Sequence, residues 1–170
     1  MNQPASGIAD SHVQMPGRPI RRVECVLYIT AALLALVGLA DSVYLTLHHL
    51  TGKDVDCLAS GECETVLTSA YAAIGKFPLA GLGALAYFAV FSLAILGAFE
   101  RDWAAPFYLL IVGAMLAATC FLLYVQAFVL HAFCDFCLLS AALTVLLSVI
   151  GFGLFLNRKK VQRDSRSRVP

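Results

Sequence analysis

The chain has 170 residues, of which 60% are hydrophobic and only 14% are charged, and its formal net charge is +1. A water-soluble domain of this length is closer to half apolar and a quarter charged. The near-neutral charge argues against a nucleic-acid partner, and the long apolar runs favour a lipid bilayer over a soluble fold.

Four apolar runs are each long enough for the roughly 20 residues that a bilayer core requires. We place them at residues 23–50, 79–99, 104–130 and 134–156, within a transmembrane domain of residues 23–157. Residues 1–22 are predicted to be a disordered N-terminus, and residues 158–170 a basic tail. The first run is too long for the core of a signal peptide, so we expect a retained helix. The predicted fold is an all-α membrane protein, a bundle of four transmembrane helices.

The loop of residues 51–77 joins the first two spans and contains an apolar pattern of helical period. A stripe at i, i+3, i+4, i+7 and i+11 is typical of one helical face, and here it consists of Cys63, Val66, Leu67, Ala70 and Ile74. The pattern predicts a short interfacial helix that lies over the end of the bundle and turns Cys63 inward.

The distribution of Lys and Arg predicts the orientation of the spans, since basic residues favour the cytoplasmic side. Ten basic residues lie on the side of the termini and of the turn between the second and third spans, whereas only Lys53 and Lys76 lie on the other side. We therefore expect a multi-pass protein of the plasma (inner) membrane with both termini cytoplasmic. The loop of residues 51–77 and the start of the last span then face the outer, oxidising compartment.

Four of the six cysteines fall at this outer face. Cys57 and Cys63 lie in the loop, and Cys134 and Cys137 form a Cys-Asp-Phe-Cys motif at the start of the last span. The positive end of a helix stabilises a thiolate, which is the reactive form of cysteine. Two such pairs at one face permit a relay by disulfide exchange. Cys25 and Cys120 lie in apolar runs and are given no role.

Two other interpretations of the four cysteines remain open. The first is a non-enzymatic tetraspan scaffold with structural disulfides, although a disulfide that closes a Cys-x-x-Cys loop adds little stability through chain entropy. The second is a four-cysteine zinc site, which usually has two close pairs of ligands. Cys57 and Cys63 are more widely spaced than that pattern, so we expect no metal.

The spacing of these residues resembles the vitamin K epoxide reductase family. The resemblance covers residues 23–156 and is carried by Asp41-Ser42-Val43-Tyr44-Leu45-Thr46, Cys57, Cys63, Ser69-Ala70-Tyr71 and Cys134-x-x-Cys137. It implies that Cys134 and Cys137 are the redox centre, with Cys137 nearer the quinone, and that Cys57 and Cys63 are the shuttle pair. It also implies that Ser69 lies beside the quinone and that a thioredoxin-like protein of the periplasm or lumen is oxidised in trans.

Two departures from the family pattern bear on the substrate. Family members that reduce vitamin K epoxide in animals carry a Tyr four residues after the second Cys of the motif, where this chain has Ala141. They also carry an Asn near the start of the second span, and residues 76–80 contain none. We therefore expect reduction of a quinone, menaquinone or ubiquinone, rather than of an epoxide.

Four further residues are candidates for contact with a quinone. Asp41 lies within the first span, where it either assists quinone protonation or, as we favour from sequence, caps a helix or pairs with a polar group. Phe121, Tyr124 and Phe128 recur at helical spacing and offer aromatic rings to a quinone, although such stripes more often face lipid or pack.

The sequence as a whole predicts a quinone-dependent thiol oxidoreductase. A reduced partner attacks the Cys57–Cys63 disulfide at Cys57, and the released Cys63 attacks Cys134. Cys137 is then freed to reduce the quinone, which is the expected electron acceptor because no flavin or haem motif is present.

Overall fold

The computed structural model describes residues 18–51, 63–69, 72–74, 77–99, 101 and 103–166. Four long helices account for most of them: α1 (Arg18–Thr51), α3 (Leu79–Ala98), α4 (Ala104–Val125) and α5 (Asp135–Arg166). A π-helical turn, η1 (Gln126–Leu130), continues α4. Between α1 and α3 lie the short helix α2 (Cys63–Leu67) and two strands, β1 (Ala73–Ile74) and β2 (Phe77–Pro78), which pair antiparallel.

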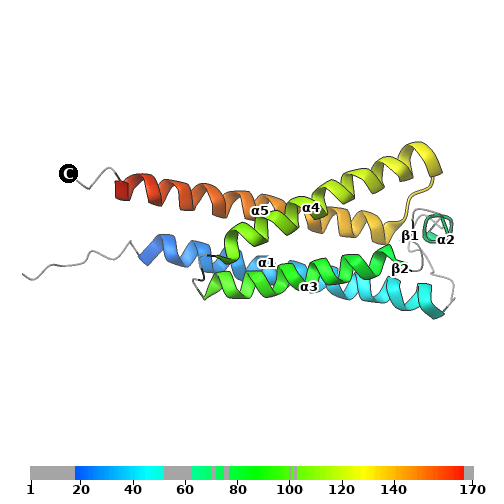
Figure 1. Ribbon diagram of the computed structural model, residues 1–170, viewed down its shortest axis with the longest axis horizontal. Coiled ribbons are helices and arrows are strands. Elements are labelled where there is room, and N and C mark those ends of the chain that lie inside the picture. Colours follow the sequence, from blue (N-terminus) through cyan, green and yellow to red (C-terminus); the bar gives the residue numbers. More distant parts are fainter. Residues whose placement is uncertain are drawn as a thin grey trace, which may run out of the picture.

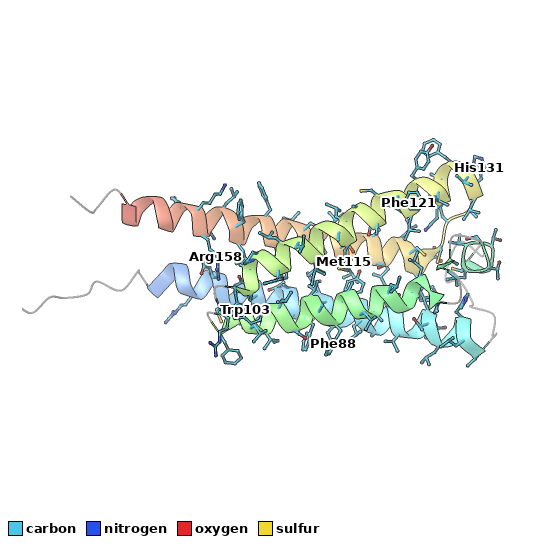
Figure 2. All side chains as sticks on the ribbon, viewed as in Figure 1. Phe88, Trp103, Met115, Phe121, His131 and Arg158 are labelled. Atoms are coloured by element: carbon cyan, nitrogen blue, oxygen red, sulfur yellow. The ribbon has the colours of Figure 1, made fainter. Side chains whose placement is uncertain are left out.

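The four long helices confirm the predicted spans. Segments Arg22–Thr51, Leu79–Ala98, Ala104–Leu130 and Asp135–Lys160 are long and apolar enough to cross a membrane. Large apolar side chains are exposed along all four helices, among them Phe88, Trp103 and Phe121 (Figure 2). An exterior of this kind suits hydrocarbon rather than water.

Each long helix packs against two others. The closest pairing is between α1 and α3, and the remaining contacts join α3 to α4, α4 to α5, and α5 to α1. Figure 1 shows α4 running obliquely to the other helices. The figure also distinguishes a terminal end, where α1 begins, α3 turns into α4 and α5 ends, from a loop end, where α2, the strands and η1 lie. These two names are kept below.

Tyrosines pack the terminal half and the middle of the bundle. The Tyr28 ring lies against Gly97 so closely that a Cβ there would overlap it, and Tyr87 is packed against Gly38 in the same way. Tyr28 also meets Tyr108 edge to face, with ring centroids 6.5 Å apart. Tyr108 Oη donates a hydrogen bond to the carbonyl of Leu147 at 3.2 Å. These residues belong to one buried cluster drawn from all four long helices.

Several boundaries differ from the sequence-based predictions. Helix α1 begins at Arg18, because Pro19 is tolerated in a first helical turn. Helix α5 continues to Arg166, since its Lys-, Arg- and Gln-containing end consists largely of good helix formers.

The interfacial helix is shorter than predicted. The side chain and the backbone N–H of Ser69 both donate to the carbonyl of Val66, at 2.7 and 3.3 Å, just after the last residue of α2. Ile74 therefore lies in β1 opposite Phe77 and not on the helical stripe, while Ala70 lies outside the described residues. The inward orientation of Cys63 is confirmed, because its side chain is fully buried.

Candidate redox site

Cys134 lies immediately before α5, at the position where a side chain caps the helix. Its carbonyl accepts the backbone N–H of Leu138 at 3.0 Å, and its side chain is fully buried. A hydrogen bond from the Cys137 thiol lowers the pKa of Cys134 from 9.0 to about 7. Backbone N–H groups of Phe136 and Cys137 act in the same direction, against the opposing effect of burial. The Cys137 thiol and two backbone N–H groups in the first turn of α5 therefore favour a thiolate at Cys134.

Cys137 is the proton-bearing partner in this pair. It lies one turn into α5 and donates its S–H to Cys134, while its side chain lines a cavity inside the bundle. Both Cys134 and Cys137 are free thiols. The pair thus presents one sulfur at the start of the helix and the other to the cavity.

Cys63 lies in the same buried cluster as Cys134. The cluster also contains Val66 and Ala132, with Leu67, Leu130, Phe136 and Cys137 packed around it. Cys63 is disulfide-bonded, and the second loop cysteine of the sequence-based prediction, Cys57, lies outside the described residues. The fold thus brings two cysteines that are remote in sequence, Cys63 and Cys134, into one water-excluded cluster.

The π-helical turn η1 supports the cysteine pair from α4. Gln126, which is 2% exposed, accepts the backbone N–H of Cys134 on its Oε1 atom at 3.3 Å, and its side chain is also hydrogen-bonded to the Cys137 thiol. The turn ends at His131, whose φ of 49° lies in the left-handed region and reverses the chain toward α5. Isolated π-turns in α-helices are frequent at functional sites.

Gln126 was missed by the sequence analysis. The available signal was a lone amide in an otherwise apolar span, eight residues before Cys134. A buried polar group in such a span needs a partner, and here the partners are the two cysteines.

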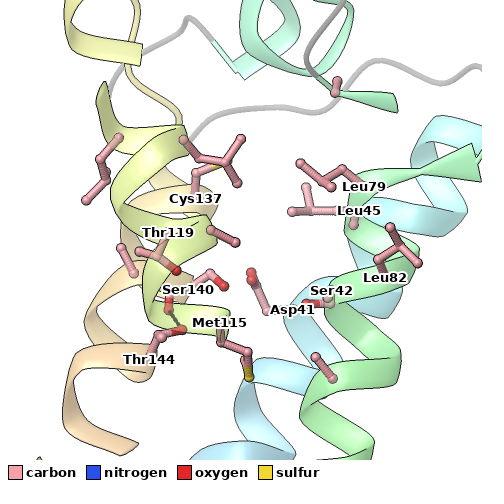
Figure 3. A pocket seen from close by; sticks show the side chains of 18 of the residues that line it. Asp41, Ser42, Leu45, Leu79, Leu82, Met115, Thr119, Cys137, Ser140 and Thr144 are labelled. Carbon is pink, nitrogen blue, oxygen red and sulfur yellow. Dashed lines mark hydrogen bonds between the residues drawn. The ribbon is translucent and has the colours of Figure 1, made fainter. Parts of the chain in front are cut away.

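A cavity of about 480 Å³ lies among α1, α3, α4 and α5 and is also bordered by Val66 and Leu67 of α2 and by Ser69, Ala72 and Pro78. Its lining is mainly apolar, with polar groups at Asp41, Ser42, Ser69, Thr119, Gln126, Ser140 and Thr144. Figure 3 shows Cys137, Ser140 and Thr144 following one another along α5, with Asp41 of α1 directed toward Ser140. A cavity of this size with a few convergent polar groups is typical of a small-molecule site.

Asp41 has none of the structural partners that the sequence analysis favoured for it. The side chain is 8% exposed, and neither carboxyl oxygen has a hydrogen-bond partner among the described residues. It neither caps a helix nor pairs with a polar group there. A carboxyl group inside a membrane span usually faces protein or water and marks function.

Ser69 lines the same cavity as Cys137, although the two come from different parts of the chain. Its hydroxyl proton is used in the bond to the Val66 carbonyl, so toward a ligand its oxygen is an acceptor. Ser69, which the family resemblance implied to lie beside the quinone, is therefore part of the cavity wall.

The three aromatic candidates do not line the cavity, so nothing in the described geometry supports their predicted contact with a quinone. Phe121, Tyr124 and Phe128 are 57%, 59% and 67% exposed. The helix turns the intervening residues Leu122, Leu123 and Gln126 toward the cavity instead, so the aromatic stripe faces lipid.

The remaining described cysteines do not belong to this arrangement. Cys25 and Cys120 are free thiols exposed on the outside of the bundle and do not line the cavity. Within the described ranges, no group of three or more His, Cys, Asp or Glu side chains is arranged to hold a metal ion.

Four membrane-spanning helices, with a dithiol at the start of the last one and facing an internal cavity, define the class of membrane-embedded thiol oxidoreductases. Comparison with family models agrees, because residues 29–152 match the model described as the vitamin K epoxide reductase family. The match covers most of the chain, and the chain belongs to this family. Membership supports a quinone-linked thiol oxidoreductase in general.

Proposed function

We propose that this protein supports disulfide formation by passing electrons from a thioredoxin-like protein to a membrane quinone. The observation that carries the proposal is the position of the Cys134–Cys137 pair. Cys134 is buried with Cys63 in the cluster that also contains Val66 and Ala132, whereas Cys137 lines the cavity. The Cys134–Cys137 pair therefore lies between Cys63, the proposed source of electrons, and the cavity, the proposed site of the acceptor.

The first transfer runs from the partner to the helix pair. A thiolate of the partner, acting in trans, attacks Cys57 and releases Cys63, which then attacks Cys134 in the Cys134–Cys137 disulfide. Disulfide exchange is favoured when the leaving thiol is stabilised as a thiolate. The second thiol of the partner then releases Cys57 from the mixed disulfide, and Cys57 attacks Cys63 in the Cys63–Cys134 bond. The low pKa of Cys134 makes it a good leaving group in this step, which completes the transfer of two electrons to the helix pair.

The second transfer takes place in the cavity, whose residues fit a quinone ring. The walls are mainly apolar, and the unpartnered carboxyl of Asp41 offers a hydrogen bond that nothing among the described residues uses. A quinone, menaquinone or ubiquinone, accepts two electrons there. Cys137 is the sulfur that contacts the quinone. The Cys134 thiolate then bonds to the Cys137 sulfur, so that the Cys134–Cys137 disulfide forms as the quinone is reduced.

The proposed orientation puts both termini in the cytoplasm and the loop end in the oxidising compartment of the plasma (inner) membrane. It rests on the ten-to-two distribution of basic residues. Labelling of Cys57 in reduced intact cells with a membrane-impermeant maleimide tests it, and labelling only after the cytoplasm is opened contradicts it.

The test of the function is quinone reduction by the purified protein with a reduced thioredoxin-like protein as donor. We expect quinone reduction in wild type and in the matched controls Cys25→Ala and Cys120→Ala, and loss of reduction in Cys134→Ala. A tetraspan scaffold with structural disulfides would show no turnover with any quinone, and its cysteines would resist dithiols.

The substrate is proposed to be a quinone rather than its epoxide. Ala141 lines the cavity and is 7% exposed, and it supplies no hydroxyl to hold a substrate oxygen. We expect vitamin K epoxide turnover to be negligible beside quinone turnover in the same preparation. Comparable rates for the two substrates would contradict this assignment, and Ala141→Tyr is expected to change the handling of quinone because it places a phenol in the cavity.

A further inference from the structure

The cavity contains a carboxyl group, that of Asp41, for which the packing of the bundle provides no structural role. Asp41 is more than nine-tenths buried, and its two oxygens lack a hydrogen-bond partner within the described part of the chain. The neighbouring hydroxyls are engaged with one another instead. Tyr87 Oη lies 2.9 Å from Ser140 Oγ and 3.2 Å from Thr144 Oγ1, and Thr144 Oγ1 donates to the Ser140 carbonyl at 2.9 Å.

The resting form of this carboxyl follows from its surroundings. An unpaired carboxylate inside a membrane span is costly, because neither water nor a cation compensates its charge. The other titratable side chains that line the cavity in the described chain are His49 on α1, Tyr87 on α3 and Cys137 on α5. No titratable side chain of α4 lines the cavity in this part of the chain, so no cation on that helix compensates a charge on Asp41. Asp41 at rest is therefore a neutral acid that carries a proton.

The chemistry of the helix pair leaves one proton unaccounted for. Reduction of a quinone to a hydroquinone takes up two electrons and two protons. The cysteine pair supplies both electrons when it forms an S–S bond, but Cys134 already lies at a helix start that favours its thiolate. Only Cys137, whose S–H is donated to Cys134, then brings a proton, and the second must come from elsewhere in the cavity.

We propose that Asp41 is the acid that supplies the second proton to the quinone. This inference rests on the proposed function and assigns a catalytic role within the same cavity. The Cys134 thiolate and the Cys137 thiol form a disulfide, the quinone gains two electrons, and the protons of Cys137 and Asp41 pass to its oxygens. The products are the disulfide, the hydroquinone and the Asp41 carboxylate, so charge and protons balance. The carboxylate regains its proton from water before the next turnover.

The position of Asp41 agrees with this role. It projects from α1 toward α5, opposite the row of Cys137, Ser140 and Thr144 (Figure 3). A flat ring between the two helices can therefore meet the Cys137 sulfur and the Asp41 carboxyl at once. General acids in such positions typically contribute 10²–10⁴-fold to a rate.

The test separates proton supply from thiol exchange. In Asp41→Asn we expect quinone reduction to fall by about a hundredfold or more. Reduction of the Cys134–Cys137 disulfide by a small dithiol, measured without quinone by mass-tag trapping of the freed thiols, is expected to stay within twofold of wild type. Asp41→Glu is expected to recover part of the quinone reduction. Glu24→Gln, which neutralises another carboxyl on α1, is the matched control and is expected to match wild type.

A second readout does not depend on turnover. Infrared difference spectra of the reduced protein on addition of menaquinone are expected to show loss of a protonated-carboxyl band, which shifts with ¹³C-aspartate labelling and is absent in Asp41→Asn. Quinone reduction in Asp41→Asn within twofold of wild type, or the same band in that variant, would overturn the assignment. Should Asp41→Asn fail to fold, absence of the band in wild type and in Asp41→Glu overturns it equally. Failure of wild type to reduce any quinone would instead refute the proposed function.

Discussion

The terminal end and the loop end of this bundle are built differently. At the terminal end, Tyr28 and Tyr108 fill the space between helices, and Gly97 lets a ring lie directly against a backbone. At the loop end, the same helices enclose a cavity of about 480 Å³. The regular packing therefore stops where the cysteines and the polar groups begin.

Backbone irregularity follows the same division. The π-turn η1, the left-handed residue His131 and the two-residue strand pair all lie at the loop end. Irregular backbone inside a membrane protein is tolerated where it is buried in protein or borders a cavity. The comparison indicates that the terminal end supplies stability and that the loop end holds the chemistry. Each prediction below tests one side of this division.

Among the residues that only support the site, the largest effect is expected at Gln126, which belongs to the loop end. Gln126→Leu removes the acceptor for the Cys134 N–H and the hydrogen bond to the Cys137 thiol. By analogy with residues that orient the ligands of metal sites, we expect quinone reduction to fall about 10- to 100-fold. Gln126→Glu keeps an acceptor for the N–H and is expected to retain more activity. Equal activity in Gln126→Leu and wild type would show that the amide only fills space.

The next effect concerns the ionisation of Cys134. Because its pKa is lowered from 9.0 to about 7, the thiolate forms as the pH rises through 7 and is complete well before an ordinary cysteine ionises. We expect the thiolate absorbance of the reduced protein to show a step near pH 7 that is missing in Cys134→Ser. A titration in which every cysteine ionises near pH 9 would remove the basis for a thiolate at the helix start.

A smaller effect is expected at the terminal end, on stability alone. Gly97→Ala puts a methyl group into the Tyr28 ring, and overpacking of this kind costs about 1–3 kcal/mol. Gly113→Ala is the matched control, because no atom lies within 4 Å of a Cβ there. Thermal unfolding in detergent is expected to separate the two variants, with quinone reduction per folded molecule unchanged in both. Loss of specific activity in Gly97→Ala would show that the two ends are not independent.

The smallest effect is expected for the outward aromatic residues of α4. Phe121→Ala and Tyr124→Ala remove rings that are more than half exposed and do not line the cavity. Rates and apparent quinone affinity within twofold of wild type are the expected result. A large rise in the quinone concentration needed for half-maximal rate would restore these residues as contacts.

Much of the fold was predictable from sequence because long apolar runs have few structural solutions in a bilayer. All four spans were predicted within a few residues, except that α5 runs ten residues further than expected, to Arg166. The path of the loop was less predictable. An apolar stripe predicted one helix through Ile74, but local hydrogen bonds of Ser69 and the pairing with Phe77 prevail there.

The site was predictable where chemistry is tied to sequence spacing and not where it depends on helix rotation. The inward position of Cys63 and the cavity position of Ser69 agree with the sequence. The aromatic stripe of α4 does not line the cavity, because helical spacing identifies residues that share a face without indicating which way that face points. The partners of Gln126 and the isolation of Asp41 depend on contacts between helices that no local pattern records.

The central claim is that electrons cross from the loop to the helix pair through Cys63 and Cys134. Both side chains are fully buried in one cluster, and a disulfide requires their Cα atoms to approach within roughly 7 Å. In Cys137→Ala, Cys134 has no disulfide partner on α5, so its thiolate attacks Cys63 of the Cys57–Cys63 disulfide and releases Cys57. The Cys63–Cys134 bond forms as the Cys57–Cys63 bond breaks, and no Cys137 thiol is present to reopen it. The most direct measurement is therefore non-reducing peptide mapping of this variant with its loop cysteines oxidised and before any reduced thioredoxin-like protein is added, with Cys120→Ala as control. The account predicts accumulation of Cys63–Cys134 in Cys137→Ala alone. A Cys57–Cys134 bond, or a Cys57–Cys63 bond that persists with no bond to Cys134, would contradict the electron path.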